Sequence, residues 1–220
     1  MLRRETKSLF FLFAGPAMRL NGWIYRRFRA PRDGAVKAHL GPGRRTYIRG
    51  WINVDANPFT PKCDLWADLR DPLPFRDSSV DAMYSHHMVE HLPNIAFHFA
   101  EVFRCLKPGG VYRVGGPNGD SAVRKFVDND VDWFDVFPDR RESVGGRLDN
   151  FIFCRQEHVA LLTYSFLSEL MSDSGFTDIR ACLPVKDSGY PEIFADCLAT
   201  EYESDYEHPH TLMVEARKPA

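Results

Sequence analysis

An ordered run of short apolar segments, each closed by a glycine turn or an acidic residue, is the feature that most constrains this fold. Residues 35–40 read as a strand that leads into a Gly-Pro-Gly turn at 41–43. Residues 51–54 read as a second strand, which ends in Asp55. In open α/β sheets, ligands bind at the carboxyl ends of the strands, and glycine there lets a ligand approach the backbone. The spacing therefore predicts an α/β sheet with a nucleoside site at that edge, where Asp55 accepts hydrogen bonds from ribose hydroxyls.

Further predicted strands end at the same edge. Residues 63–67 precede Asp68, whose carboxylate can accept from an adenine amino group, and residues 80–84 lead into Ser85-His86-His87. Apolar periodicity then predicts two helices and three more strands, with a surface loop between the last two strands. The helices are expected at 94–106 and 164–174, and the strands at 111–114, 177–182 and 211–216.

These motifs resemble those of the class I S-adenosylmethionine-dependent methyltransferases, in the type 11-like branch. The branch pattern is L-G-x-G, G-W-I-N-V-D, D-L before L-P-F, E-H-L and L-K-P-G-G, found here at 40–43, 50–55, 68–69 with 73–75, 90–92 and 106–110. The resemblance is close over residues 35–118 and loose over 158–218. It implies a Rossmann-like, mostly parallel sheet of order 3-2-1-4-5-7-6, with S-adenosyl-L-methionine as the cofactor.

The resemblance also implies a role for individual residues. The implied cofactor-binding set is Gly41, Pro42, Gly43, Asp55, Ala56, Asp68, Leu69 and Ser85. The glycines lie near the methionine moiety in this assignment, Asp55 at the ribose, and Asp68 with Leu69 at the adenine. If the acceptor is a hydroxyl, His86 or His87 is the best-placed general base, because each follows the fourth strand. The alternative is that these histidines only position the substrate or complete the turn.

Two departures from the family pattern bear on the site. His39 stands before the glycine turn, where many class I members have an acid, and Pro42 stands where the branch often has cysteine. The linkers between the first three strands are also short, with ten residues, 41–50, after the first. A parallel crossover usually needs about a dozen residues or more, so full helices are not expected there. We therefore expect a thinly covered sheet face near the cofactor, shielded by residues 1–34 or by a second subunit in a homodimer.

Residues 1–34 form a basic, aromatic N-terminal extension ahead of a methyltransferase domain at 35–220. Its first 32 residues hold eight Lys or Arg and one Glu, which gives them a net charge of +7. Because the whole chain has a formal net charge of −2, the remaining residues carry a net charge of −9. The apolar run at 9–14 is shorter than the ~20 residues that a membrane span needs. Contact with an anionic membrane surface and a secretory signal peptide are alternatives, although Pro16 weakens the latter. The slightly favoured interpretation is a cap helix that packs Phe10, Phe13, Trp23 and Tyr25 on the sheet.

Composition narrows the class of protein. A chain of 220 residues with 44% hydrophobic content can bury one substantial core. The formal net charge of −2 gives no reason to expect a nucleic-acid partner. Five cysteines without a C-x-x-C pair argue against a disulfide framework and favour a cytoplasmic protein, with residues 1–34 as its candidate contact with the inner membrane surface.

The stretch from His87 to His91 offers a different chemistry, because it matches the zinc-protease pattern H-x-x-E-H with Glu90 as the acid. On a helix, His87 and His91 would share a face. Pro93 would interrupt such a helix, and the motif directly follows a strand. Zinc hydrolysis through these residues is therefore a remote alternative, and no metal is predicted.

Residues 119–157 lack regular periodicity and are predicted to be an insertion that shapes the substrate site, in which Trp133, Phe134 and Phe137 line a pocket or fill a lid. The leading function is methyl transfer to a small-molecule or glycan acceptor by O-methylation. The glycan comes from the resemblance, since this branch often occurs with polysaccharide biosynthesis. A non-catalytic cofactor-binding partner subunit is the alternative. A nicotinamide oxidoreductase is disfavoured because the turn lacks a third glycine and Asp55 lies too close to it.

Overall fold

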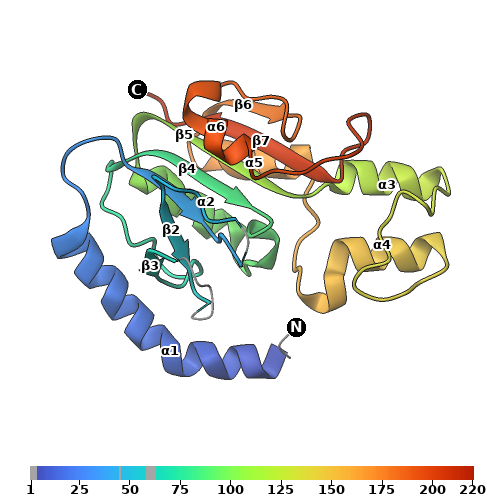
Figure 1. Ribbon diagram of the computed structural model, residues 1–220, viewed down its shortest axis with the longest axis horizontal. Helices are drawn as coiled ribbons and strands as arrows, with labels where there is room; N and C mark the ends of the chain where they lie inside the picture. The colour runs from blue at the N-terminus through green and yellow to red at the C-terminus, as the bar shows by residue number, and fades with distance from the viewer. Residues whose placement is uncertain (1–3, 45, 58–62) are drawn as a thin grey trace.

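The computed structural model of this chain describes residues 4–44, 46–57 and 63–220. Its centre is a seven-stranded sheet of order β3-β2-β1-β4-β5-β7-β6 (Figure 1), which confirms the predicted order. Strands β1 to β5 run parallel, and β7 runs antiparallel to β5 and β6. The strands are β1 (Lys37–Leu40), β2 (Ile52–Asp55), β3 (Leu65–Trp66), β4 (Val80–His86), β5 (Leu106–Pro117), β6 (Thr177–Cys182) and β7 (Thr211–Arg217).

Side-chain caps set the starts of most of the helices. Asn94, Asn118, Ser143 and Thr163 each accept a hydrogen bond from a backbone N–H in the first turn of the helix that follows. The α-helices are α1 (Arg4–Ile24), α2 (Ile95–Cys105), α3 (Gly119–Val127), α4 (Val144–Phe153), α5 (Tyr164–Asp173) and α6 (Pro191–Leu198). Short helical turns are η1 (Tyr25–Arg29), η2 (Val89–His91) and η3 (Cys154–Gln156). The two predicted helices are thus present, whereas α3, α4 and α6 were not predicted.

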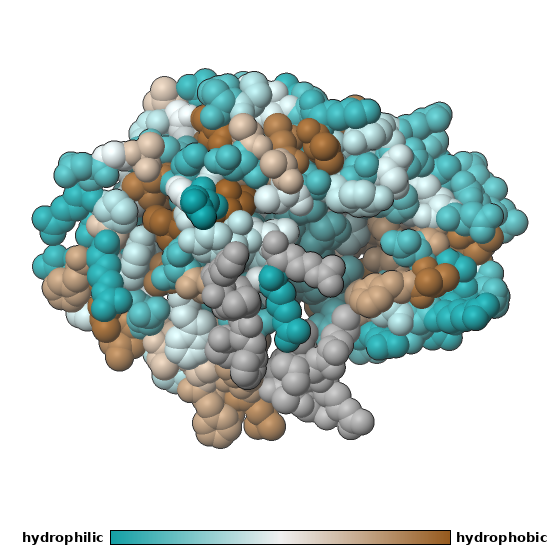
Figure 2. Space-filling model, in the orientation of Figure 1, coloured by the Kyte–Doolittle hydropathy of each residue, from teal (hydrophilic) through white to brown (hydrophobic). Residues whose placement is uncertain are grey.

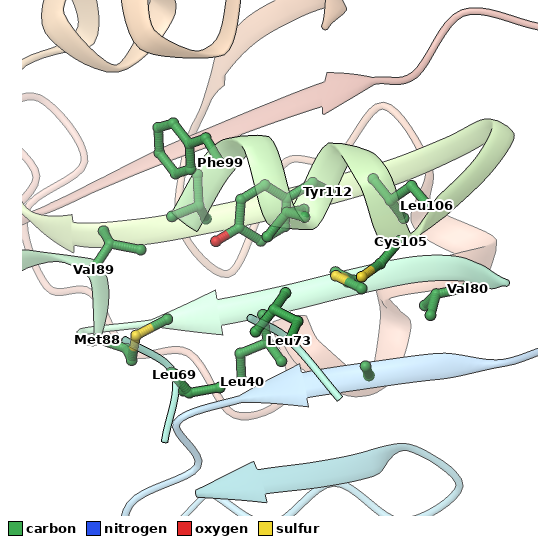
Figure 3. Packing of buried hydrophobic residues seen from close by; sticks show 14 of the residues in the cluster. Leu40, Leu69, Leu73, Val80, Met88, Val89, Phe99, Cys105, Leu106 and Tyr112 are labelled. Carbon is green, nitrogen blue, oxygen red and sulfur yellow. The ribbon is translucent and has the colours of Figure 1, made fainter. Parts of the chain in front are cut away.

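The main core lies between one face of the sheet and helices α2 and α5. Leu40, Val89 and Tyr112 meet Phe99 and Cys105 of α2 there (Figure 3). The ring centroids of Phe99 and Tyr112 are 6.0 Å apart at an edge-on angle. This packing holds β1, β4 and β5 in register, so their carboxyl ends reach the same edge.

The opposite face is covered by α6 and by the segment between β1 and β2. The ring of Trp51 stacks on Phe194 of α6 at 6.0 Å and lies 4.9 Å from Lys37 Nζ. Tyr84 of β4 and Met213 of β7 complete this second cluster. Within the described part of the chain, no helix joins β1 to β2 or β2 to β3, as the short linkers predict. The expected cover from residues 1–34 is therefore replaced at this face by α6 and Trp51.

Helix α1 packs beside β3 instead. Met18 is buried, Asn21 Nδ2 donates to Trp66 O at 2.8 Å, and the rings of Tyr25 and Phe75 are 6.0 Å apart. Phe13 and Trp23 are 77% and 51% exposed, so the prediction that they pack on the sheet is wrong. No helix in the described residues is both long and apolar enough to span a membrane.

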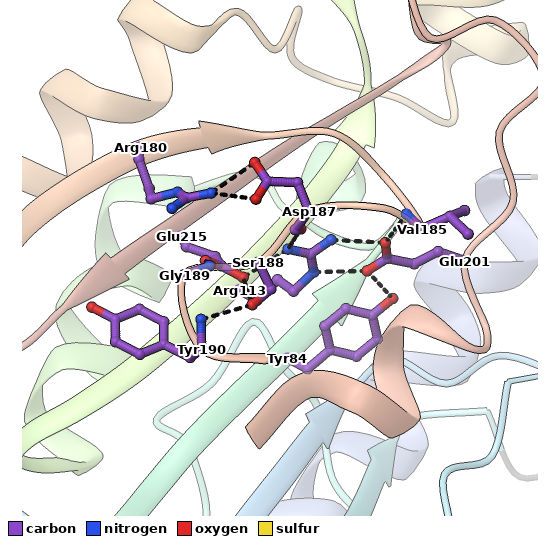
Figure 4. A network of polar contacts seen from close by, with 10 residues as sticks. All are labelled: Tyr84, Arg113, Arg180, Val185, Asp187, Ser188, Gly189, Tyr190, Glu201 and Glu215. Atoms are coloured by element: carbon purple, nitrogen blue, oxygen red, sulfur yellow. Dashed lines mark hydrogen bonds and ion pairs between the residues drawn. The ribbon is translucent and has the colours of Figure 1, made fainter. Parts of the chain in front are cut away.

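A buried ionic network joins β5, β7 and the segment after α6 (Figure 4). Arg113 is fully buried and donates from Nε to Glu201 Oε1 and from Nη1 to Glu215 Oε1, both at 2.7 Å. Tyr84 OH donates to Glu201 Oε1 at 3.3 Å. The network lies on the α6 side of the sheet and fixes the C-terminal strands against β5.

Candidate functional site

The glycine turn after β1 has a backbone shape that favours glycine. Gly41 has φ +76°, and a Cβ atom there would lie 2.4 Å from Met88 Cγ. Gly43 has φ +57° but open space at its Cβ position. Gly41 N donates to Val54 O at 2.9 Å, and Pro42 O accepts from Thr46 N at 3.3 Å. The turn is therefore tied to β2 and leaves open space beside Gly43.

Asp55, at the end of β2, faces this turn. Its carboxylate accepts from Gly43 N at 3.0 Å and from Asn57 N at 2.8 Å. Burial raises the pKa of Asp55, although hydrogen bonds from the backbone of Asn57, Gly43 and Ala56 oppose that shift. Because an ionised carboxylate has about four acceptor sites, Asp55 keeps capacity for a further donor beside these backbone groups. Ala56 contributes its carbonyl to Trp66 Nε1 at 3.0 Å and so fixes the chain after Asp55.

Asp68 and Leu69 follow β3 and are both buried. Arg70 donates hydrogen bonds to both oxygens of the Asp68 carboxylate, from Nε to Oδ1 at 2.9 Å and from Nη2 to Oδ2 at 2.6 Å. The Leu69 side chain lies 3.8 Å from the Cβ position of Gly41. The structure thus brings Leu69 to the glycine turn, while Asp68 already holds a partner that the sequence did not indicate.

At the end of β4, the polar side-chain atoms Ser85 Oγ and His86 Nε2 are buried and do not face the open edge of the sheet. Ser85 Oγ lies 2.7 Å from Tyr112 OH in the core, so only its backbone is free to serve a ligand. His86 Nε2 is buried and has no hydrogen-bond partner among the described residues. Burial, followed by the charges of His87, His39 and Arg113, lowers the pKa of His86 to about 3. This histidine is therefore neutral at physiological pH and a weak proton acceptor.

His87 differs from His86 in its exposure and in its hydrogen-bond partners. Its side chain is 46% exposed, and its φ is +52°, which turns it out of the strand. Its Nδ1 lies 3.3 Å from Glu90 Oε1 and its Nε2 lies 3.2 Å from Thr211 Oγ1. A carboxylate on one ring nitrogen orients a histidine so that the other can move a proton. Thr211 is the site residue that sequence reasoning missed. Glu90 was noted only through the H-x-x-E-H and E-H-L patterns, and its contact with His87 in a methyltransferase-like site was not predicted.

Glu90 itself is fully buried. Burial alone would raise its pKa, but the contact with His87 and the charges of His87 and His91 bring the pKa below its usual value. The carboxyl group is thus held as the anion that a neighbouring imidazole needs.

The helical geometry behind the H-x-x-E-H alternative is absent. The turn η2 contains only Val89, Glu90 and His91, and His87 lies outside it with a positive φ. His87 and His91 therefore do not share a helix face, because a single 3₁₀ turn is too short to align them.

Comparisons with known proteins agree with this geometry. A family model described as a methyltransferase domain matches residues 56–114. A curated relative from Mycolicibacterium smegmatis, described as a probable S-adenosylmethionine-dependent methyltransferase, is 40% identical over 58 residues, which are 26% of this chain and 23% of the relative. The methyltransferase-domain match covers about a quarter of this chain, and the sheet has the strand order that the resemblance to class I methyltransferases implies. The description of that relative names S-adenosylmethionine, and this chain spans about a quarter of the relative's length.

Solved structures show the same fold at low identity. A Thermotoga maritima S-adenosylmethionine-dependent methyltransferase, described as a possible histamine N-methyltransferase, aligns with TM-score 0.54 and 15% identity over 97% of this chain and 95% of its own. A Haloferax volcanii protein in complex with the Trm112 methyltransferase activator aligns with TM-score 0.52 and 18% identity over 100% and 98% of the two chains. These likenesses concern the fold of this chain alone.

The segment 119–157 projects beyond the carboxyl ends of β4 and β5 as helices α3 and α4 (Figure 1). Trp133 and Phe134 pack with Phe151 inside it, and the Trp133 ring stacks on His210 at 4.2 Å. Phe137 is 63% exposed. Trp133 and Phe134 are therefore buried inside the segment 119–157, whereas Phe137 is not. The surface is hollowed between this segment and the sheet (Figure 2).

Two cavities lie away from the carboxyl edge of the sheet. One of about 250 Å³ is lined by Val136, Arg140, Glu142 and Arg147 in the inserted segment. The other, of about 410 Å³, lies at the opposite end of the strands, beside Val36, Ser79 and Lys107. Neither includes Asp55 or His87, so the case for a nucleoside site stands on the turn and the side chains around it.

Proposed function

We propose that this methyltransferase transfers a methyl group from S-adenosylmethionine to a hydroxyl of a small-molecule or glycan acceptor. One observation carries the proposal: the glycine turn, the half-buried Asp55 and the exposed His87 meet at one edge of the sheet. When bound, the cofactor supplies the activated methyl group. The turn at 41–43 would hold its methionine part, Asp55 its ribose, and Asp68 with Leu69 its adenine.

The residues of this chain fit that group. Asp55 keeps acceptor capacity beyond its backbone hydrogen bonds, and a Cβ atom at Gly43 would meet open space. The buried Ser85 hydroxyl supports a backbone role for that residue. Methyl transfer is an in-line displacement, so the main task of the protein is to fix donor and acceptor at a productive angle.

We assign the role of general base to His87. In the proposal, its Nε2 accepts the proton of the acceptor hydroxyl, a position that Thr211 Oγ1 occupies here at 3.2 Å. Glu90 orients the ring through Nδ1 and stabilises the imidazolium that forms. The low pKa of His86, about 3, supports His87 over His86 in this role.

The test is production of S-adenosylhomocysteine with a panel of sugars, sugar nucleotides and small hydroxylated acceptors. We expect turnover by the wild type, and for His87→Gln a rate lower by about 100-fold or more, because general bases contribute 10²–10⁴-fold. Cofactor affinity should not change in this variant. His208→Gln, a histidine of the loop before β7, is the matched control and should keep the wild-type rate.

Wild-type rates in His87→Gln would contradict the assigned base. No turnover with any acceptor, together with intact cofactor binding, would favour the alternative of a non-catalytic cofactor-binding partner subunit. Two observations motivate that alternative: His39 replaces the acid before the turn, and the similar Haloferax volcanii protein is in complex with an activator.

We also propose that α1 and η1 contact an anionic membrane surface. Apolar side chains recur along the outer face of this segment at helical spacing, and Figure 2 shows tan and brown surface along the lower edge of the molecule, where α1 lies. These exposed residues are Leu9, Leu12, Phe13, Leu20, Trp23 and Phe28. Arg27 and Arg29 are exposed beside them. An exposed apolar face flanked by arginines is typical of helices that lie in the interface of anionic bilayers.

Basic groups continue from η1 into the 410 Å³ cavity, which Arg27, Arg32, Arg76 and Lys107 line together with Asp77. Co-sedimentation with vesicles tests the proposal. Binding to phosphatidylglycerol vesicles should exceed binding to phosphatidylcholine vesicles and should fall in the Leu12→Gln/Phe13→Gln variant, but not in Val127→Gln, which is exposed on α3. Equal binding by all variants would contradict it. A wild-type dimer that the double substitution dissociates would indicate a second copy as the occupant.

A further inference from the structure

Three side chains from two distant segments converge beside η2. Glu90 and His91 belong to η2, and His158 follows η3 in the chain. One ligand atom from each lies within 4.8 Å of the other two. Val159 N donates to Glu90 O at 2.8 Å, which fixes the second segment against η2. The cluster is therefore built by the fold, because nothing in the H-x-x-E-H spacing includes His158.

Each of the two histidines has its Nδ1 atom next to a backbone carbonyl oxygen. His91 Nδ1 lies 2.9 Å from Glu157 O, and His158 Nδ1 lies 3.1 Å from Ile152 O. A carbonyl oxygen only accepts, so each Nδ1 carries the proton and each Nε2 keeps its lone pair. Metal-binding histidines commonly use this arrangement, in which a backbone carbonyl fixes the tautomer.

The carboxylate of Glu90 gives a second observation, separate from the clustering of the three side chains, that points to a bound cation. The residue is fully buried, and its Oε1 atom is hydrogen-bonded to His87 Nδ1 at 3.3 Å. Oε2 is buried without a hydrogen-bond partner among the residues that the structure describes. A buried carboxylate oxygen without a partner is unfavourable, and a cation would compensate it.

We propose that Glu90, His91 and His158 bind one divalent transition-metal ion of the zinc class. Two imidazole nitrogens and one carboxylate oxygen form a donor set that suits Zn²⁺ better than Mg²⁺ or Ca²⁺, which prefer oxygen ligands. Tetrahedral bonds of about 2.0–2.1 Å place ligand atoms roughly 3.3 Å apart, so the side chains must close by about 1.5 Å on binding. Three protein ligands leave one coordination position for water or another oxygen donor.

The site would clamp η2 to the segment 154–159, at the carboxyl end of β4. His87 is not one of its ligands and stays with Glu90 Oε1, so the ion would complement the proposed proton transfer without replacing it. The inference differs from the hydrolase alternative, which needs His87 and His91 on one helix. It also does not depend on the proposed methyl transfer, because metal binding can be measured without any acceptor.

The test is titration of the chelator-treated full chain with Co²⁺, whose visible absorption reports low-coordinate nitrogen and oxygen ligands, followed by displacement with Zn²⁺. We expect one ion per chain. In His158→Ala the affinity should fall by about 100-fold or more, because even residues behind metal ligands contribute 10–100-fold. His91→Ala, at an exposed position, should show the same loss if His158→Ala fails to fold. His208→Ala is the matched control and should bind like the wild type.

Binding that survives in both ligand variants would identify an adventitious ion and overturn the inference. So would a wild type that binds no Co²⁺ at millimolar concentration. Calorimetry with S-adenosylmethionine on the same preparations separates this failure from a failure of the proposed function, because cofactor binding does not require the ion.

Discussion

At the scale of single residues, the two glycines of the turn have different reasons to be glycine. Gly41 combines a positive φ with Met88 directly at its Cβ position, whereas Gly43 has a positive φ and open space. The first is a packing constraint, and the second is a constraint of backbone conformation alone. Comparing the two positions therefore separates the effect of steric contact with Met88 from the effect of backbone strain at a positive φ.

Gly41→Ala should destabilise the protein more than Gly43→Ala. The left-handed conformation costs about 1–2 kcal/mol for a residue with a Cβ, and both variants carry this cost. Overpacking against Met88 adds about 1–3 kcal/mol for Gly41→Ala only. Urea unfolding of the two variants measures the difference in the free energy of unfolding. Equal losses would show that Met88 moves away freely and that the turn is looser than its geometry indicates.

Sequence reasoning located residues at the edge better than it located their side chains. Strand order and turn chemistry placed Asp55 beside Gly43, and they meet at 3.0 Å. The direction of Ser85 was not accessible in the same way, because successive strand residues point to opposite faces and the register to Tyr112 depends on the whole sheet. Arg70 on Asp68 was missed because a pair two residues apart has no periodic signal.

At the scale of elements, the second face of the sheet depends on contacts between distant parts of the chain. The partners of Arg113 are 88 and 102 residues away in sequence, at Glu201 and Glu215. Helix α6 has only eight residues, too few for a clear helical period, although Pro191 in its first turn is a start signal. Helix α3 was obscured by its glycine-rich start, where Asn118 acts as a cap and does not end a turn.

Glu201→Ala should cost about 3–5 kcal/mol in the free energy of unfolding, because it leaves a buried guanidinium without one of its two anionic partners. Asp187→Ala is the matched control. Its ion pair with Arg180 is about two-fifths exposed on both sides, and exposed pairs contribute only about 0–1 kcal/mol. The measurement is urea unfolding followed by circular dichroism. If both variants lost a similar amount of unfolding free energy, the buried network would not contribute the stability that we expect of it.

At the scale of the whole molecule, folding keeps several histidines neutral. Burial lowers the pKa of His39 and of His98 to about 4 each, and that of His86 to about 3. The unfolded chain takes up protons at these positions below a pKa of about 6.5. Between about pH 6.5 and pH 4 the unfolded state thus binds more protons than the native state, so stability is fully present above that window and falls as the pH falls through it.

The thermal midpoint should therefore drop steadily when the pH is lowered from 7 to 4.5. Each buried histidine contributes up to about 1.4 kcal/mol per pH unit within the window. His98→Gln removes one titrating group and should flatten this dependence. A slope that His98→Gln does not change would contradict the buried, neutral state of His98.

The central claim is that the carboxyl edge of the sheet, with Asp55 at the ribose, binds S-adenosylmethionine. Calorimetric titration with S-adenosylmethionine and S-adenosylhomocysteine tests it most directly, on the wild type, on Asp55→Asn, and on Asp173→Asn as an exposed control at the end of α5. Hydrogen bonds to a charged group contribute about 1.5–3 kcal/mol, so Asp55→Asn should bind about 10- to 100-fold more weakly, with the control unchanged. A wild type that binds neither ligand, or an Asp55→Asn variant with wild-type affinity, would contradict the account.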